Sequence, residues 1–507
     1  MKRLTLDFFD ETCQSYPDRT ALTDPEGTLS FSQLRALSRR IASGLMPQCP
    51  PRSTVGVYLD KGIPAVAAFL GCTYSGCAYA PLNLRHPAAR IHDILETLDA
   101  PLVITDEAHR QALSEMTDRP IVLVEDLSLC ACDELLLSRV RSQMLDVDPL
   151  YVNFTSGSTG TPKGVVLCHR NVVDFIPDFT DIFGITSEDI LANQAPFDFD
   201  VSVKDLYSGF FTGASVLIIP TAYFTQPVVL MDYLCSHEVT VLIWAVSALC
   251  FLTTMNALAY RLPDKVRQIM FSGETMPIRH LHKLQKYLPQ VRYVNLYGPT
   301  EITCNCTYYI VDREFEEGQA LPIGIPFPNE HVFLLDEQDH EVTQCGQTGE
   351  LCVSGSCVGL GYYANPEKTA QAFTQNPLQS RYPEKIYRTG DLVRIEENGE
   401  WVYVSRKDFQ VKHMGHRIEL GEIETQLQAA PGVNRAVCLY LHDKGRILAF
   451  VEGTEDKAAL SDFLRIRLPE YMIPNIFQFV PEMPITKNGK IDRQALARSY
   501  EERKKKK

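Results

Sequence analysis

Short apolar runs alternate with helical patterns along the first part of the chain. Residues Val55–Tyr58, Leu102–Ile104 and Ile121–Val124 are apolar runs of strand length, which is typical of buried strands. Between them, Ala65–Tyr74 and Ala88–Leu98 carry apolar residues at helical spacing, so we expect two amphipathic helices. Strands that alternate with helices favour parallel sheets covered by helices. The pattern therefore predicts an α/β fold.

The pattern changes near residue 400. A predicted strand, Trp401–Val404, is followed by a polar turn and then by about one hundred residues with their own helix, Leu420–Ala429, and their own strands. A segment of this size can bury a small core of its own. We expect a large N-terminal domain of βαβ subdomains over residues 1–407 and a small, mobile α+β domain over residues 408–507. A surface turn inside a single domain is the alternative.

Composition narrows the class of protein. With 507 residues, 45% hydrophobic and 22% charged, the chain is typical of a globular protein of several domains. Its net charge of −14 argues against broad binding to nucleic acid or a membrane surface. No apolar stretch is long enough for a signal peptide or a bilayer span. The fifteen scattered cysteines lack zinc spacing and are expected to be reduced thiols in a cytoplasmic protein.

One loop has the composition of a phosphate site. The segment TSGSTGTPKG combines small hydroxyl residues and glycines, which let a backbone approach an anion, with one lysine. It is not a Walker A loop, because Pro162 precedes the lysine and Gly164 follows it. Predicted strands flank it at Tyr151–Phe154 and Val165–Leu167. A flexible turn without a ligand is the alternative. The candidate phosphate-binding residues are Thr155, Ser156, Gly157, Ser158, Thr159, Gly160 and Lys163.

This loop resembles the phosphate loop of the adenylate-forming superfamily, which includes acyl-CoA synthetases, luciferases and amino-acid adenylation domains. Further segments resemble the other motifs of that superfamily, in order and over nearly the whole chain. They are LSFSQL (29–34), AYAPLN (78–83), NLYGPTE (295–301), GELCVSG (349–355), YRTGDL (387–392), SRKDFQVKHMGHRIELGEIE (405–424), LPEYMIP (468–474) and NGKIDR (488–493). A run of motifs in sequence favours this family over chance.

The resemblance implies how ATP and Mg²⁺ are bound. Tyr297 would stack on adenine, Thr300 would contact the α-phosphate and Glu301 would hold Mg²⁺, a hard cation that prefers carboxylate oxygen. The remaining nucleotide contacts implied by the resemblance are Asn295 on the adenine, Gly298 in the turn, Asp391 on both ribose hydroxyls, and Arg406 on the ribose and phosphate side.

The resemblance also implies a catalytic lysine on the small domain. Lys490 would reach the substrate carboxylate and the α-phosphate, and would stabilise the charge that builds up when two anions react. Asp408 matches the hinge about which the small domain turns between two half-reactions. The usual glycine before Arg406 is Ser405 here.

The segment APFDFDVSVKDLY resembles the fourth motif of amino-acid adenylation domains. Asp200 would pair with the α-ammonium of an amino acid, although helix capping is the alternative for an Asp before a helical run. Lys204 either faces the substrate, favouring a side chain with a hydrogen-bond acceptor, or is a solvated helix residue. The pocket residues carried over are Asp200, Val201, Lys204, Ile243, Met270, Ser272, Leu296, Cys304 and Asn305.

The overall resemblance is to stand-alone enzymes such as D-alanine–D-alanyl carrier protein ligases, with Ser272 where that subfamily often has Cys. The chain contains no carrier segment, so we expect transfer to the phosphopantetheine thiol of a separate carrier protein. Two alternatives stay open: an acyl- or aryl-CoA ligase with CoA as acceptor, and a non-catalytic nucleotide-binding relative.

Overall fold

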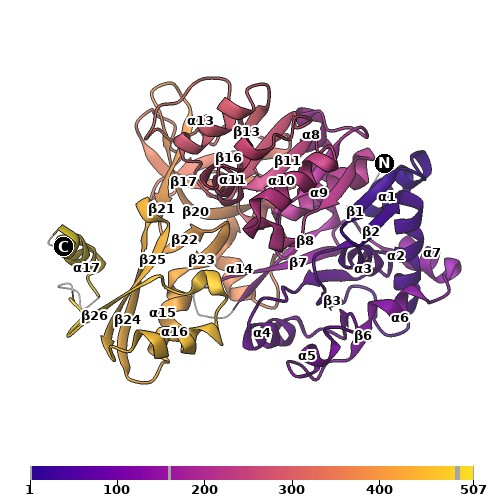
Figure 1. Ribbon diagram of the computed structural model, residues 1–507, viewed down its shortest axis with the longest axis horizontal. Coiled ribbons are helices and arrows are strands. Elements are labelled where there is room, and N and C mark those ends of the chain that lie inside the picture. The colour runs from indigo at the N-terminus through magenta and orange to yellow at the C-terminus, as the bar shows by residue number, and fades with distance from the viewer. Residues whose placement is uncertain (1–2, 158–161, 486–490, 506–507) are drawn as a thin grey trace. The chain divides into compact units, whose positions relative to one another are not determined.

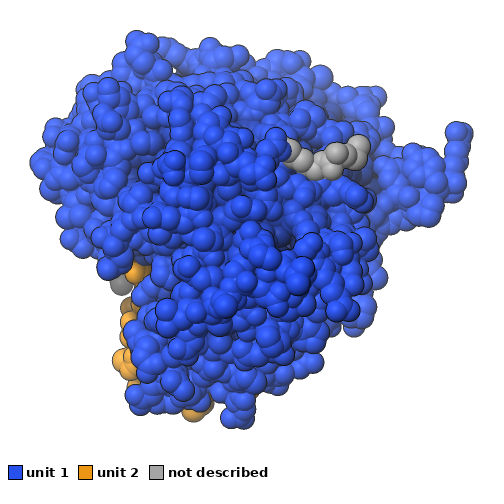
Figure 2. All heavy atoms as spheres, turned by 90° about the vertical axis from the view of Figure 1, so that its right-hand side faces the viewer, with its two compact units in different colours: residues 1–84, 95–154, 164–407 blue, residues 85–94, 155–163, 408–507 orange. Residues whose placement is uncertain are grey.

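The computed structural model describes residues 3–157, 162–485 and 491–505. The chain divides into two compact units. Unit 1 holds residues 1–84, 95–154 and 164–407, and unit 2 holds residues 85–94, 155–163 and 408–507. Figure 2 shows unit 1 in blue and unit 2 in orange. The two domains predicted above, 1–407 and 408–507, stay a prediction.

The largest sheet of unit 1 has nine strands in the order β15-β14-β13-β12-β11-β9-β10-β1-β2 (Figure 1). Its central strands, from β13 through β1, run parallel, and its edge strands pair antiparallel. The strands are β1 Thr20–Asp24, β2 Gly27–Ser30, β9 Ile190–Asn193, β10 Ser215–Ile218, β11 Val241–Ala245, β12 Gln268–Ser272, β13 Arg292–Tyr297, β14 Thr307–Ile310 and β15 Ile325–Pro326.

A second sheet of unit 1 has seven strands in the order β18-β8-β7-β4-β3-β5-β6, and the pairings among β7, β4, β3, β5 and β6 are parallel. The α/β prediction is therefore confirmed. The strands are β3 Thr54–Val57, β4 Ala78–Pro81, β5 Val103–Thr105, β6 Ile121–Leu123, β7 Pro149–Thr155, β8 Lys163–Cys168 and β18 Gly361–Tyr362.

The helices follow the apolar pattern with one exception. Helix α4 spans Ala88–Leu98, as predicted. Helix α3 spans Ile63–Tyr74 and is buried on every side except at Pro64, so the prediction of an amphipathic helix was wrong there. A helix that is apolar all round belongs in a core. The other long helices of unit 1 are α1 Thr5–Ser15, α2 Phe31–Leu45, α8 His169–Phe183, α9 Val201–Thr212, α10 Pro227–Ser236, α11 Val246–Thr254 and α13 Ile278–Tyr287.

Antiparallel strands complete unit 1, in a five-stranded sheet of order β16-β17-β20-β19 with β21 beside β20. These strands are β16 Glu330–Leu335, β17 Thr348–Gly355, β19 Phe373–Gln375, β20 Lys385–Ile395 and β21 Trp401–Arg406. Unit 2 has two small sheets, β22-β23 and β24-β25-β26, and a core of its own. Its main elements are β22 Gln410–His413, β23 His416–Glu419, α15 Leu420–Gln428, β24 Val433–Leu441, β25 Arg446–Gly453, α16 Lys457–Arg465, β26 Ile476–Val480 and α17 Arg493–Lys505.

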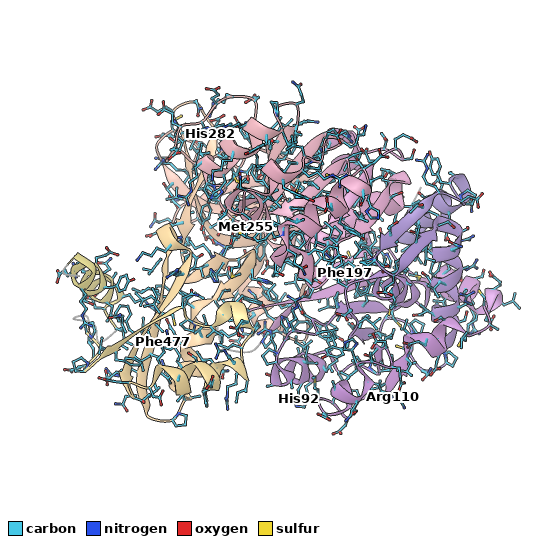
Figure 3. All side chains as sticks on the ribbon, viewed as in Figure 1. His92, Arg110, Phe197, Met255, His282 and Phe477 are labelled. Carbon is cyan, nitrogen blue, oxygen red and sulfur yellow. The ribbon has the colours of Figure 1, made fainter. Side chains whose placement is uncertain are left out.

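Helix α9 lies in the interior of unit 1. It packs against α1, α8 and strands β9, β10 and β11 (Figure 1), and nearly all its side chains are buried. It ends at Gly213, whose φ of 84° is left-handed and where a Cβ would lie 2.6 Å from Tyr16. Just before α9, Phe197, labelled in Figure 3, packs edge-on against Phe69 with 5.4 Å between ring centroids. None of the described helices is both long and apolar enough to span a bilayer.

Candidate active site

A buried cluster of three side chains joins the predicted nucleotide motifs. The Tyr297 hydroxyl, at the end of β13, donates a hydrogen bond to Asp391 Oδ2. The Arg406 guanidinium donates to Asp391 Oδ1 at 2.6 Å, since β20 and β21 pair these two residues. Burial, with the Asp391 carboxylate beside it, raises the pKa of Tyr297 well above its ordinary value, so the phenol remains a donor. Three residues predicted to bind the nucleotide are thus in direct contact.

Asn295, two residues earlier on β13, is already engaged in the protein. Its Nδ2 donates to the Pro322 carbonyl at 2.8 Å. That bond fixes the amide orientation and leaves Oδ1 pointing away from Pro322. A contact between Asn295 Oδ1 and the adenine stays a prediction.

In the turn after β13, only glycine fits at position 298. A Cβ there would lie 2.5 Å from Asn305 Cα and 2.9 Å from the Cys304 carbonyl oxygen, a backbone clash that cannot relax. Thr303 and Cys304 have φ of 59° and 72°, which is strained for non-glycine residues. This tight loop brings Cys304 and Asn305 back against the motif that contains Tyr297.

Glu301, the predicted Mg²⁺ ligand, is 0% exposed and accepts a hydrogen bond from the Tyr362 hydroxyl at 2.8 Å. Thr300 beside it is also buried. Across residues 3–157, 162–485 and 491–505, no group of three His, Cys, Asp or Glu side chains could hold a metal alone. One oriented carboxylate suits a Mg²⁺ ion that phosphates and water also coordinate. Tyr362, missed from the sequence, orients that carboxylate.

The predicted phosphate loop leaves β7 at Thr155 and returns at Lys163, the first residue of β8, so the prediction that it joins two strands is confirmed. Within unit 2, the Ser156 hydroxyl donates to the Arg417 carbonyl at 2.7 Å, and the Gly157 N–H donates to Glu422 Oε2 at 3.2 Å. The predicted phosphate contacts Ser158, Thr159 and Gly160, and the predicted catalytic Lys490, lie outside the described residues.

Glu422 forms a buried ion pair within unit 2. Its carboxylate lies 2.7 Å from Arg90, and both side chains are at most 4% exposed. Burial raises the pKa of Glu422, and Arg90 opposes that rise. Neither residue was singled out from the sequence, although Glu422 falls inside the quoted segment 405–424. Asp408, the predicted hinge, accepts the Gln410 N–H at 3.0 Å, and its hinge role stays a prediction.

Asp200 and Lys204 lie at the start of α9 in the interior of unit 1. Asp200 immediately precedes the helix, but its side chain makes no capping hydrogen bond to the described first turn, so capping does not explain it. Lys204 is 0% exposed and donates to Asn305 Oδ1, so the interpretation of Lys204 as a solvated residue was wrong. Burial lowers the pKa of Lys204, against the opposing effects of Cys304, Asp200 and Asp205.

The apolar pocket residues share one face of the large sheet. Ile243 and Met270 are paired neighbours on β11 and β12, and Leu296 is on β13. All three lie in one core cluster with Val201 and Cys304, whereas the alternate residues Leu242, Trp244, Ile269, Phe271 and Tyr293 belong to a second cluster. Ser272 follows Met270 by two positions and therefore points to the same side. The carried-over pocket positions thus converge beside α9.

Two opposite charges near this pocket, Lys61 and Asp205, were not predicted. Lys61 Nζ donates to the carbonyls of Asn193, Gln194 and Ile219 at 2.8–2.9 Å. Asp205 accepts from Asn193 Nδ2 at 2.8 Å, and burial raises the pKa of Asp205 to about 7. No sequence motif marks Lys61, because only the fold brings it to these strand ends.

Known proteins resemble this chain over most of its length. Residues 9–363 match the model of the AMP-binding enzyme family, and residues 422–490 match the AMP-binding enzyme C-terminal domain. The chain is 33% identical to zwittermicin A synthase ZmaJ of Bacillus cereus, over 96% of this chain and 94% of that protein. It is 32% identical to tyrocidine synthase 1 of Brevibacillus parabrevis, over 96% of this chain but only 44% of that larger protein.

A solved structure agrees with these matches. Holo-PA1221, described as a nonribosomal peptide synthetase protein with adenylation and carrier (PCP) domains, superposes with a TM-score of 0.84 at 25% identity. The superposition covers 98% of this chain and 84% of that one. From its fold, its motifs and these matches, the chain belongs to the AMP-binding enzyme family and is an adenylate-forming enzyme related to nonribosomal peptide synthetase adenylation domains.

Proposed function

We propose that the chain activates an amino acid with ATP as the aminoacyl-adenylate, releases pyrophosphate, and then transfers the aminoacyl group to the phosphopantetheine thiol of a separate carrier protein. An acyl- or aryl-CoA ligase is the second candidate, favoured only by the shared fold. Among the subfamilies, the sequence resembles the D-alanine enzymes.

One observation carries the proposal: strand β13 and its following loop serve two sites at once. Leu296 lies in the apolar pocket, whereas the next residue, Tyr297, donates to Asp391 in the nucleotide cluster. Seven residues later, Cys304 Sγ donates to the Asp200 carbonyl at 3.2 Å, beside the buried start of α9. A carboxylic acid bound in the pocket would therefore lie next to a nucleotide bound at Asp391.

The buried carboxylate selects for amino acids. Asp200 is 6% exposed, and a buried carboxylate favours a ligand that carries a positive charge. The α-ammonium of an amino acid would bring that charge, whereas fatty and aryl acids have no such group. Acids without an ammonium are therefore expected to be poor substrates.

In the first half-reaction, a carboxylate oxygen of the amino acid attacks the α-phosphorus of ATP, and the bond from that phosphorus to pyrophosphate breaks. Asp391 would accept the ribose hydroxyls through its remaining lone pairs while Tyr297 and Arg406 hold it in place. Mg²⁺, held by Glu301, would neutralise phosphate charge. Thr300 and Lys490 would contact the reacting α-phosphate.

In the second half-reaction, the carrier thiol attacks the activated carbonyl and AMP leaves. We propose that residues 408–507 form the domain that turns about Asp408 for this step. A carrier protein as acceptor is supported by relatives such as holo-PA1221, in which adenylation and carrier domains occur together.

The test is hydroxylamine trapping of the adenylate, followed by transfer of labelled amino acid to holo-carrier protein or to CoA. Asp200→Asn should lower kcat/KM for the amino acid about 30-fold or more, because removing one member of a buried charge pair costs about 2–5 kcal/mol. Asp198→Asn is the matched control, since Asp198 bonds the Asn83 side chain and should leave kcat/KM near wild type. Hydroxamates from fatty acids, or equal activity in Asp200→Asn, would contradict the proposal.

A further inference from the structure

Asp200 and Lys204 mark two points of one substrate site. They are four positions apart at the start of α9, so their side chains share a helix face with about 5–6 Å between Cβ atoms. Asp200 is nearly buried and Lys204 completely so. A substrate whose α-ammonium meets Asp200 would have its side chain directed along this face toward Lys204.

The Lys204 ammonium has unfilled donors. An ammonium has three N–H donors, and within the described part of the chain its one hydrogen-bond acceptor is Asn305 Oδ1. Buried donors without acceptors are costly, and more so when the group is charged. Lys61 shows the contrast, because three carbonyl oxygens fill all of its donors. Among the described residues, Lys204 therefore has donors left for an acceptor beyond Asn305.

The Asn305 amide has its oxygen toward Lys204, because an ammonium cannot accept a hydrogen bond. Its NH₂ group supplies two further donors. The amide is held in place by its loop: Thr303 Oγ1 donates to the Cys357 carbonyl at 2.7 Å, and the Cys306 N–H donates to the Tyr297 carbonyl at 2.8 Å. Lys204 and Asn305 together therefore present mainly donors, with one positive charge.

The charges near Lys204 leave room for one more anion. Asp205 accepts from Asn193 and lies near both the Lys204 and the Lys61 ammonium groups, and Asp200 is assigned to the substrate ammonium, so two ammonium groups share one carboxylate. A hydroxyl or carboxamide would bring donors of its own toward a surface of donors. A carboxylate has only acceptors and forms charge-assisted bonds, so it complements both groups.

We propose that the activated substrate is an amino acid with a side-chain carboxylate, of the aspartate or glutamate type, held by Lys204 and Asn305 at its side chain. This rests on the proposed function, and it names the substrate class of that site. The apolar neighbours Val201, Met270 and Leu296 would contact the methylene groups between the two carboxylates.

The test is ATP–pyrophosphate exchange with aspartate, glutamate, asparagine, glutamine, serine, alanine and leucine, each as D and L forms. Wild type should favour a dicarboxylic amino acid by about 100-fold in kcat/KM over its carboxamide, as expected for a site whose buried polar groups are otherwise left unpaired. A preference for a neutral or hydroxy amino acid would overturn this inference while leaving the proposed function intact. Exchange with no amino acid would instead refute the proposed function.

Two variants separate recognition from folding. Asn305→Asp places a carboxylate against Lys204 at almost unchanged volume, so it should lower exchange with the dicarboxylic substrate about 100-fold and with its carboxamide far less. Lys204→Met should lose the same preference. Asn256→Asp is the matched control, because it makes the same amide-to-carboxylate change at the exposed start of α12 (Ala257–Tyr260). Unchanged selectivity in Asn305→Asp, with wild-type melting temperature, would overturn the inference.

Discussion

The Tyr297–Asp391 hydrogen bond offers a quantitative test of the nucleotide site. Tyr297→Phe removes one hydroxyl and leaves the ring, while Arg406 still pairs with the other oxygen of Asp391. A hydrogen bond to a charged group contributes about 1.5–3 kcal/mol. If that bond orients Asp391 for the ribose, its loss should weaken ATP binding about 10- to 100-fold, since 1.36 kcal/mol is a factor of ten. The turnover number kcat should change little, because the ribose contact is the same in the ground and transition states.

The assay is pyrophosphate exchange at varied ATP and saturating amino acid, with calorimetry of ATP binding alongside. Tyr293→Phe is the matched control: Tyr293 is on the same strand and is also buried, but its hydroxyl donates to the Leu288 carbonyl at 3.0 Å. It should lower stability and leave the KM for ATP unchanged. Wild-type ATP affinity in Tyr297→Phe, or an equal rise in KM for Tyr293→Phe, would refute this account of Asp391.

Three further predictions follow from single contacts. Gly298→Ala should abolish pyrophosphate exchange, because the added Cβ would clash with Asn305 Cα. Gly27→Ala is the control and should be active, because no atom lies within 4 Å of its added Cβ. An active Gly298→Ala enzyme would contradict the tight packing of this loop. Glu301→Gln should raise the Mg²⁺ concentration needed for half-maximal pyrophosphate exchange about tenfold or more, measured by titration with Mg²⁺. An unchanged midpoint would show that Glu301 does not bind the metal. Burial lowers the pKa of His169 to about 3. Below about pH 6.5 the unfolded chain therefore binds a proton that the folded chain does not. The free energy of unfolding should fall as the pH drops from 6.5 toward 3, by about 2 kcal/mol at pH 5. Urea midpoints at pH 7 and 5 should therefore differ less for His169→Gln than for wild type, and equal pH dependence would contradict the shift.

Local patterns predicted the parts of the fold that depend on neighbours in sequence. Helix α4 begins and ends where its periodicity does, and strands β7 and β8 flank the predicted phosphate loop. The failure at α3 has a physical reason. Val66, Phe69 and Leu70 recur at helical spacing, but the residues between them are mostly alanine and glycine, which are small and not polar, so the helix can be buried on nearly all sides.

Contacts between distant segments could not be predicted from the sequence. The direction of Lys204 is set by Asn305, about one hundred positions away, and a lysine on a helix is usually solvated. Tyr362 reaches Glu301 only because β18 pairs with β8. The donors of Lys61 are filled by carbonyls at the ends of strands far along the chain, so no local signal marks it.

The most direct test of amino-acid activation is ATP–pyrophosphate exchange with two pools of acids, one of D- and L-amino acids and one of fatty and aryl acids. The account predicts exchange with the first pool, loss of that exchange in Asp200→Asn, and background exchange with the second pool. Exchange supported by fatty or aryl acids, or by neither pool, would contradict it.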